Sequence, residues 1–174
     1  MLFPPVPENE SIRLKALMGL NILDTEPNDK IEIITKFASY FIGAPICLVS
    51  LVDENRQWFK SCHGLDVKET PRYMSFCAHA ICETSALNHD SRFFEICDAQ
   101  TDIRFKNNPL VKQDPKIRFY IGYVLQSETK LNLGTLCIID TKPRKFTDGE
   151  RDLLKALGTM VQNILNGHSY FPDY

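Results

Sequence analysis

The 174-residue chain lacks any apolar run near the roughly 18 residues that a membrane-spanning helix needs. Its formal net charge is only −2, so neither nucleic acid nor an acidic membrane surface is favoured as a partner. The first residues have neither the basic region nor the long apolar run of a secretory signal peptide. No Cys-x-x-Cys pair is present among six cysteines, which argues against a disulfide framework. These absences together predict a cytoplasmic protein with reduced thiols.

The composition is that of an ordinary globular domain. Hydrophobic residues make up 44% of the chain and charged residues 24%. The length suits one domain with a substantial core. We predict a disordered tail over residues 1–7, which hold three prolines, one domain over residues 8–166, and a second tail over residues 167–174.

A predicted β-hairpin over residues 45–65 organises the rest of the chain. Residues 46–52 are apolar on both alternating faces, which is typical of a strand covered on both sides, and Ser50 is the only polar interruption. Residues 53–56 are polar and suit a tight reversal. Residues 57–63 form the second strand, with aromatic side chains that favour a pleated surface.

Helices and further strands surround this hairpin. Helices are predicted over residues 8–20, from Thr25 to Gly43, over residues 75–82, and from a capping box formed by Thr147 and Glu150. In the second of these, the inner apolar face is predicted to include Phe41. Strands are predicted over residues 93–99, 116–126 and 131–140. The fold class is α+β: an antiparallel sheet with the N- and C-terminal helices on one face, and a short helix plus the long 99–115 loop on the other.

Several strings in the chain are specific enough to identify a family. They are RL at 13–14, LDTEP at 23–27, PI at 45–46, LVSLVDENRQWFKS at 48–61, ETPR at 69–72, SFCAHAI at 75–81, NPLV at 108–111 and LGTLCIID at 133–140. In these the chain resembles a GAF domain, and within that family a bacterial subgroup found ahead of histidine kinase and diguanylate cyclase domains. The resemblance covers residues from about 8 to 165. It implies a non-catalytic sensory module of signal transduction that binds a small molecule.

The chain departs from that subgroup in two places. Gly122-Tyr123-Val124-Leu125 stands where the subgroup usually has Gly-Ala-Pro-Leu, so a bulky Tyr123 either fills a pocket or contacts a ligand. Residues 82–97 replace the usual short apolar strand, which puts that strand in doubt. No output domain follows the final helix, so we expect the signal to leave through a partner, such as a separate kinase or cyclase protein.

The expected small-molecule pocket lies between the sheet and the 66–115 segment. Its candidate ligand-binding residues come from the short helix and from the strand that follows the long loop, where three side chains are predicted to alternate along one pocket face. They are Phe76, Cys77, His79, Arg118, Tyr120 and Tyr123. No catalytic residue is predicted. No metal site is predicted either, because residues 77 and 79, which would be its ligands, do not share a helix face. The cofactor or ligand remains unidentified.

The last helix carries a possible dimer seam. Leu154, Leu157, Val161 and Ile164 are spaced three, four and three apart, as in a coiled coil, but span under three heptads. The seam therefore packs on its own sheet, on the first helices or on a second subunit, and we expect a homodimer formed through it.

Two alternatives to a sensor stay open. One is a thiol-dependent reductase of a small oxidised metabolite, such as free methionine sulfoxide, acting through Cys77 or Cys137. The other is a ligand-free interaction scaffold in which Tyr123 fills the pocket.

The loop residues Asp98, Asp102 and Arg104 are interpreted as ties that hold the 99–115 loop in place.

Overall fold

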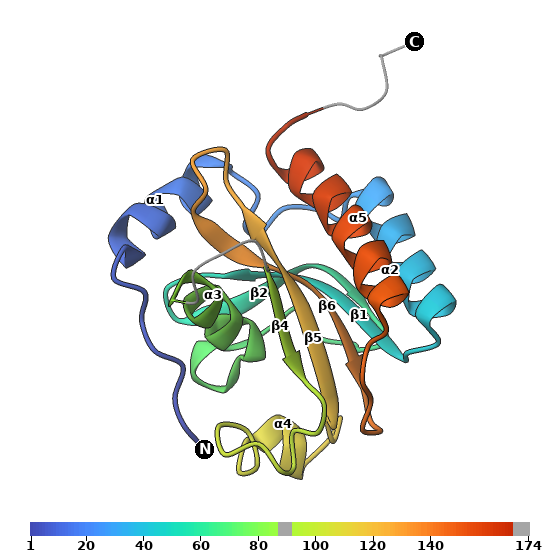
Figure 1. The fold of residues 1–174 in the computed structure, drawn as a ribbon. Helices are drawn as coiled ribbons and strands as arrows, with labels where there is room; N and C mark the ends of the chain where they lie inside the picture. Colours follow the sequence, from blue (N-terminus) through green and yellow to red (C-terminus); the bar gives the residue numbers. More distant parts are fainter. Residues whose placement is uncertain (87–91, 169–174) are drawn as a thin grey trace.

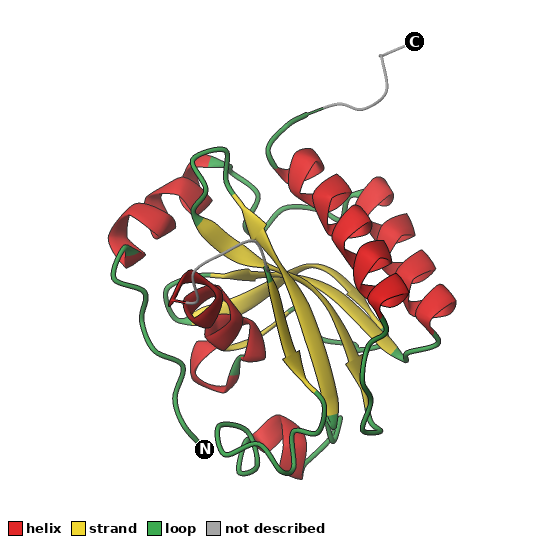
Figure 2. Ribbon diagram, in the orientation of Figure 1, coloured by secondary structure: helices red, strands yellow, loops and turns green. Residues whose placement is uncertain are grey.

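The computed structural model describes residues 1–86 and 92–168, which form a six-stranded antiparallel sheet between two helical layers (Figures 1 and 2). The strands lie in the order β3-β2-β1-β6-β5-β4. Their bounds are β1 Ile46–Val52, β2 Arg56–His63, β3 Glu69–Pro71, β4 Phe93–Ile96, β5 Phe119–Gln126 and β6 Asn132–Asp140. The helices are α1 Glu10–Gly19, α2 Asp29–Ile42, α3 Phe76–Ala86, α4 Pro109–Lys112 and α5 Asp148–Leu165, with a short 3₁₀ turn at Arg72–Met74. The predicted α+β class is confirmed.

Helices α2 and α5 lie side by side on one face of the sheet (Figure 1). The capping box predicted for α5 is present: the Thr147 hydroxyl accepts from the Glu150 amide, and the Glu150 carboxylate accepts from the Thr147 amide. Helix α2 begins later than predicted, because the Asn28 side chain caps it by accepting from two amides of the first turn. The predicted cap, Thr25, instead donates its hydroxyl proton to the carbonyl of Ile22.

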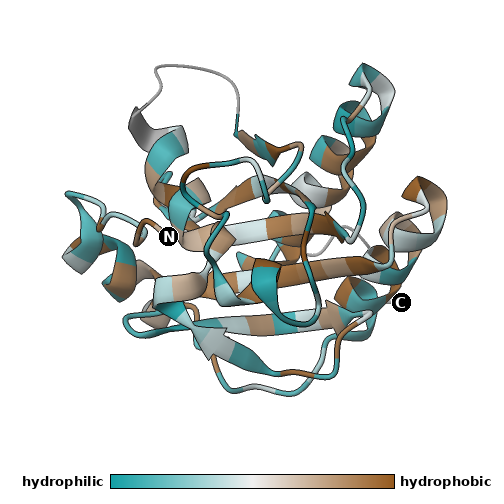
Figure 3. Ribbon diagram, turned by 90° about the horizontal axis from the view of Figure 1, so that it is seen from below, coloured by the Kyte–Doolittle hydropathy of each residue, from teal (hydrophilic) through white to brown (hydrophobic). Residues whose placement is uncertain are grey.

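The central strands are buried on both faces, as their apolar patterns predict. In β1, Cys47, Val49 and Leu51 pack against the α2 and α5 layer, whereas Ile46, Leu48 and Val52 belong to the core on the opposite face. The strongly hydrophobic colouring follows these middle strands when the sheet is seen from below (Figure 3). The sheet therefore separates two hydrophobic cores and contributes to both.

The opposite face is covered by α3 and by the segments around β3 and α4 (Figure 1). The Ser75 hydroxyl caps α3 by accepting from the Ala78 amide at 3.0 Å, as predicted. The doubtful strand is present as β4, which pairs with β5 at the edge of the sheet. Helix α4 lies within the predicted 99–115 loop, and the three-residue β3 lies in a stretch for which no strand was predicted. Residues 87–91 lie outside the described part of the chain.

Helix α5 corrects the predicted dimer seam. Leu154, Leu157 and Val161 are buried in the chain's own core against the sheet and α2, and Ile164 packs at its edge. The three-four spacing therefore marks the face of an amphipathic helix that covers its own sheet, one of the alternatives the spacing left open. Helix α2 also departs from prediction: Phe41 is 66% exposed, and Ile42 takes the inner position.

The N-terminal segment is extended and runs beside α3 (Figure 1). The Leu2 amide donates to the Arg104 carbonyl at 3.1 Å, and the Phe3 ring meets the Tyr73 ring edge-on. These contacts were not expected of a disordered tail. Of the predicted C-terminal tail, residues 169–174 lie outside the described residues. Within the described ranges 1–86 and 92–168, the helices are all too short or too polar to cross a bilayer.

Candidate functional site

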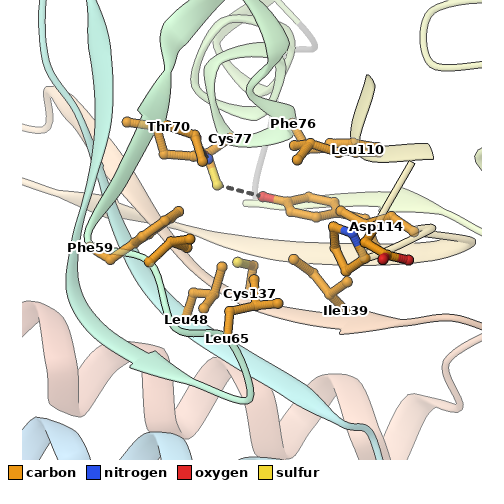
Figure 4. Close-up of a pocket in the computed structure, with 15 residues that line it drawn as sticks. Leu48, Phe59, Leu65, Thr70, Phe76, Cys77, Leu110, Asp114, Cys137 and Ile139 are labelled. Carbon is orange, nitrogen blue, oxygen red and sulfur yellow. Dashed lines mark hydrogen bonds between the residues drawn. The ribbon is translucent and has the colours of Figure 1, made fainter. Parts of the chain in front are cut away.

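A cavity of about 260 Å³ lies between the sheet and the α3 layer (Figure 4). Its floor comes from β1, β2, β5 and β6, and its walls come from α3, α4 and the segments at 65–70 and 114–117. The lining residues are Leu48, Gln57, Phe59, Leu65, Val67, Thr70, Phe76, Cys77, Leu110, Asp114, Pro115, Ile117, Tyr120, Cys137 and Ile139. Val67 and Asp114 are exposed, so the cavity reaches the surface between their two segments. Its volume lies just below the roughly 300–1,000 Å³ of sites for drug-sized ligands.

Most side chains around the cavity are apolar. Asp114, at the rim, is the one carboxylate among the lining residues, and none of them is lysine or arginine. An anionic ligand buried here would therefore lack a charge partner, which is costly in an apolar setting. The cavity suits a small uncharged molecule.

Two thiols and three hydroxyls form a polar cluster at the inner end of the cavity. The Cys77 sulfur, on α3, accepts from the Tyr120 hydroxyl at 3.2 Å and from the Thr135 hydroxyl at 3.0 Å. Cys137, on β6, also points its sulfur into the cavity (Figure 4). Ser50 lies beside the Cys77 sulfur, and its fully buried hydroxyl has no well-formed hydrogen bond within the described structure.

The sheet register brings this cluster together. Ser50 pairs with Thr135 and Leu48 pairs with Cys137 across β1 and β6. Tyr120 reaches the cluster because Gly122 has no side chain: a Cβ there would lie 2.5 Å from the Tyr120 hydroxyl oxygen. Ser50, the only polar residue of β1, therefore stands at the point where the cavity becomes polar.

The cluster shifts the pKa values of the two thiols in opposite directions. Burial alone raises the pKa of the Cys77 thiol, but hydrogen bonds from Cys137, Thr135 and Tyr120, together with the Ser50 hydroxyl beside the sulfur, outweigh burial and bring the pKa to about 7. Burial raises the pKa of Cys137 and of Tyr120 well above their usual ranges, so both stay protonated. Cys77 is thus the group of the cluster that ionises near neutral pH.

Three of the six predicted binding residues line the cavity: Phe76, Cys77 and Tyr120. His79 does not, because it is two residues from Cys77 on α3 and turns away from the cavity. Its ring packs edge-on against Phe105, and its Nδ1 lies 3.5 Å from a Glu83 carboxylate oxygen. Burial lowers the pKa of His79.

Arg118 and Tyr123 also lie outside the cavity, and the predicted alternation with Tyr120 along one face is wrong. Tyr123 is three residues from Tyr120, so in a strand it faces the other side of the sheet, where it packs under α5. There its ring contacts Phe93 and its hydroxyl bonds to Arg92. Tyr123 therefore does not fill the cavity.

Arg118 is a structural tie. Its guanidinium makes two hydrogen bonds to the Asp98 carboxylate, at 2.8 and 2.7 Å, and thereby fixes the start of the long loop. Arg104 is held in the same way by Asp102, and it also bonds to Glu83 on α3. The role of loop ties predicted for Asp98, Asp102 and Arg104 agrees with these contacts. Residues 1–86 and 92–168 contain no group of three or more His, Cys, Asp or Glu side chains placed to hold a metal ion.

Sequence reasoning missed most of the cavity lining, including Leu48, Phe59 and Ile139, and it named Cys137 as a possible reductase thiol but not as a lining residue. The alternation within β1, β2 and β6 does assign each of these side chains to a face. What it does not supply is the register that sets Cys137 opposite Leu48.

A family comparison now identifies the fold. The model of the GAF domain matches residues 26–165. The chain belongs to the GAF domain family.

A curated relative is a cyclic di-GMP phosphodiesterase of Pseudomonas aeruginosa, to which the chain is 42% identical over 144 residues. The match covers 83% of this chain but only 23% of the relative, so the chain spans about a quarter of that protein.

Solved structures share the GAF fold. The GAF domain of an Acinetobacter phosphoenolpyruvate-protein phosphotransferase aligns with a TM-score of 0.61 at 15% identity, covering 90% of this chain and 94% of that one. A free methionine-R-sulfoxide reductase of Neisseria meningitidis, solved with its substrate, aligns with a TM-score of 0.61 at 12% identity, covering 96% and 97%. At these identities the likeness shows the fold alone, and the same fold occurs in a domain of a phosphotransferase and in a methionine sulfoxide reductase.

Proposed function

We propose that this GAF domain is a non-catalytic cytoplasmic sensor that binds a small uncharged molecule in the cavity and transmits its occupancy to α2 and α5. The observation that carries the proposal is the cavity itself, which opens to solvent beside Val67 and Asp114 and is lined mostly by apolar side chains. A scaffold without a ligand has no need of such a space, since cores are normally packed without voids of this size.

The sheet offers a direct path for the signal. Leu48 lines the cavity, while its neighbours Cys47 and Val49 pack beneath the helices on the other face. If the sheet has two conformations and the ligand binds one of them more tightly, binding shifts the domain towards that conformation, and the layers on both faces of the sheet change together. The tight packing of the two cores makes this shift a displacement of whole elements rather than a local adjustment.

The output is proposed from the curated relative. Because that protein is a cyclic di-GMP phosphodiesterase about four times longer than the match, we assign the domain to the regulation of a signalling enzyme, whether a phosphodiesterase, a cyclase or a histidine kinase. This agrees with the subgroup that the sequence resembles.

The homodimer is proposed on a new surface, since the α5 seam is buried. Exposed apolar side chains follow one stripe of α2 at helical spacing: Ile33, Phe37, Tyr40 and Phe41. Phe37 and Phe41 stack with ring centroids 5.7 Å apart, and Tyr40 is 88% exposed. A second copy of the chain would cover this α2 stripe and place the two signalling helices together.

Blocking the cavity mouth tests the sensor. Leu65 is half-buried at the rim, so Leu65→Trp should close the entrance without overpacking the core, and Ile103→Trp on an exposed loop is the matched control. Native mass spectrometry of protein purified without added ligand, and ligand-observed NMR with cyclohexanone as an apolar probe, should show binding to wild type and to Ile103→Trp but not to Leu65→Trp. Binding that is equal in the two variants, or absent from wild type, would refute the proposal.

A thiol-dependent reductase is the second candidate, favoured by the two thiols that line one cavity. Free methionine sulfoxide, however, carries an ammonium and a carboxylate, and Asp114 is the one charged side chain among the residues lining the cavity. We therefore expect no turnover of that substrate with dithiothreitol as reductant. If the wild type turns over that substrate and Cys77→Ser does not, the reductase would be better supported than the sensor.

A further inference from the structure

We propose that Cys77 is a site of covalent addition for a small apolar α,β-unsaturated carbonyl compound, an enone or a quinone, that enters the cavity. This inference rests on the proposed function, because it names the class of ligand that the sensor takes. It is carried by the geometry around one sulfur atom, which combines a nucleophile, hydroxyl donors and an apolar space for a carbon skeleton (Figure 4).

The hydrogen bonds identify Cys77 as the nucleophile. Its sulfur accepts from two hydroxyls, and these bonds are strongest when the sulfur carries a negative charge. Cys137 stands beside the same sulfur and adds a thiol proton, and the Ser50 hydroxyl lies next to it. The arrangement stabilises a thiolate in a site that water-free burial would otherwise keep neutral.

The cavity selects the electrophile. Its lining is dominated by Leu, Ile, Phe and Val side chains, and a small peroxide or a charged disulfide gains little from such walls. An apolar ring or chain does gain from them, and a volume of about 260 Å³ restricts it to a compact molecule. Among the described residues, the buried Ser50 hydroxyl beside Cys77 has no hydrogen-bond partner, so it is a further donor for a polar group that the ligand brings.

The reaction balances without a co-reactant. The Cys77 thiolate attacks the β-carbon, a C–S bond forms, and the C=C π pair moves through the α-carbon onto the carbonyl oxygen as an enolate. As the sulfur loses its charge, the Tyr120 and Thr135 hydroxyls are released to donate to that oxygen. The proton that left the thiol returns to the α-carbon, so nothing is oxidised or reduced overall.

The test compares buried Cys77 with exposed Cys97 in the same protein. The probe is cyclohexenone, its saturated analogue cyclohexanone is the control ligand, and adducts are located by intact mass and peptide mapping. Accessibility alone favours Cys97. Burial and Glu95 raise the pKa of Cys97, however, so at pH 7 we expect Cys77 to react at least about tenfold faster. In urea the two thiols should react alike.

The pH profile adds a second readout. The Cys77 rate should rise with pH and level off above about 7, whereas the Cys97 rate should still be rising at pH 9. Tyr120→Phe removes one donor and should slow Cys77 and move its plateau to higher pH. Tyr73→Phe removes an exposed hydroxyl elsewhere and should change neither.

Several results would overturn the inference: adducts at Cys97 alone, equal rates at the two thiols, or a Cys77 rate that does not level off. If cyclohexanone binds reversibly in the cavity but cyclohexenone leaves Cys77 free, the covalent inference fails while the sensor proposal stands. If the Cys77 adduct forms without altering hydrogen exchange in α2 and α5, the modification site stands and the signalling route fails.

Discussion

Replacing Gly158 by alanine should destabilise the domain, although alanine is the better helix former. Gly158 lies in the middle of α5, directly over Tyr123 of β5, and a Cβ there would approach the Tyr123 Cδ1 atom to 2.3 Å. The ring has little freedom to yield, because it is 2% exposed and packs against Phe93. Helix propensity favours alanine by about 1 kcal/mol, whereas overpacking a dense core costs about 1–3 kcal/mol.

Gly149 provides the matched control within the same helix. A Cβ at Gly149 would meet no atom within 4 Å, so Gly149→Ala should gain up to about 1 kcal/mol from propensity alone. The two variants should then differ in free energy of unfolding by about 1–3 kcal/mol, with Gly158→Ala the less stable. Urea denaturation followed by the fluorescence of Trp58, the only tryptophan and a buried one, measures the difference at unchanged m-value. Equal stability of the two variants would refute the direct contact of α5 with β5.

Two further predictions concern the α2 stripe and the half-buried carboxylate of Glu10 on α1. Phe37→Glu should convert a dimer into a folded monomer, as measured by light scattering. Val161→Glu should instead unfold the chain, because Val161 lies in the core. A folded Val161→Glu monomer would support the dimer seam on α5 after all. Burial opposes ionisation of Glu10, but its bonds to Arg13 and Arg72 prevail and lower its pKa to about 2. This group therefore contributes on the order of 2–3 kcal/mol that is complete above its unfolded pKa and is lost as pH falls towards 2. The stability gap between wild type and Glu10→Gln should narrow from pH 6 to pH 3, and a constant gap would contradict the assignment.

Much of the fold was predictable because burial on two faces leaves a clear pattern. The apolar run of β1, interrupted only by Ser50, predicted a central strand, and the structure gives each of its two faces its own core. The one polar residue in that run, Ser50, proved to stand beside Cys77 at the inner end of the cavity. Alternation within one strand depends only on that strand's own residues, so the two faces of a strand can be assigned without knowing which strands lie beside it.

The site was less predictable because it depends on how elements meet. Phe76, Cys77 and Tyr120 were found, but Tyr123 was assigned to the wrong side although its odd spacing from Tyr120 excludes a shared face. Cys137 joins Cys77 only through the register of β6 on β1, which is set by the packing of the whole sheet. The α5 spacing shows which face is apolar and leaves open what that face covers.

The two halves of the proposal meet on strand β5. Tyr120 faces the cavity and bonds to Cys77, and three residues later Tyr123 faces the opposite layer, where the backbone of Gly158 rests on its ring. No side chain of α5 stands between helix and strand at that point, so a displacement of β5 moves α5 directly. Coupling between two sites is reciprocal. A ligand that moves Tyr120 therefore biases α5, and a change that moves α5 biases the cavity, even though the two surfaces share no residue.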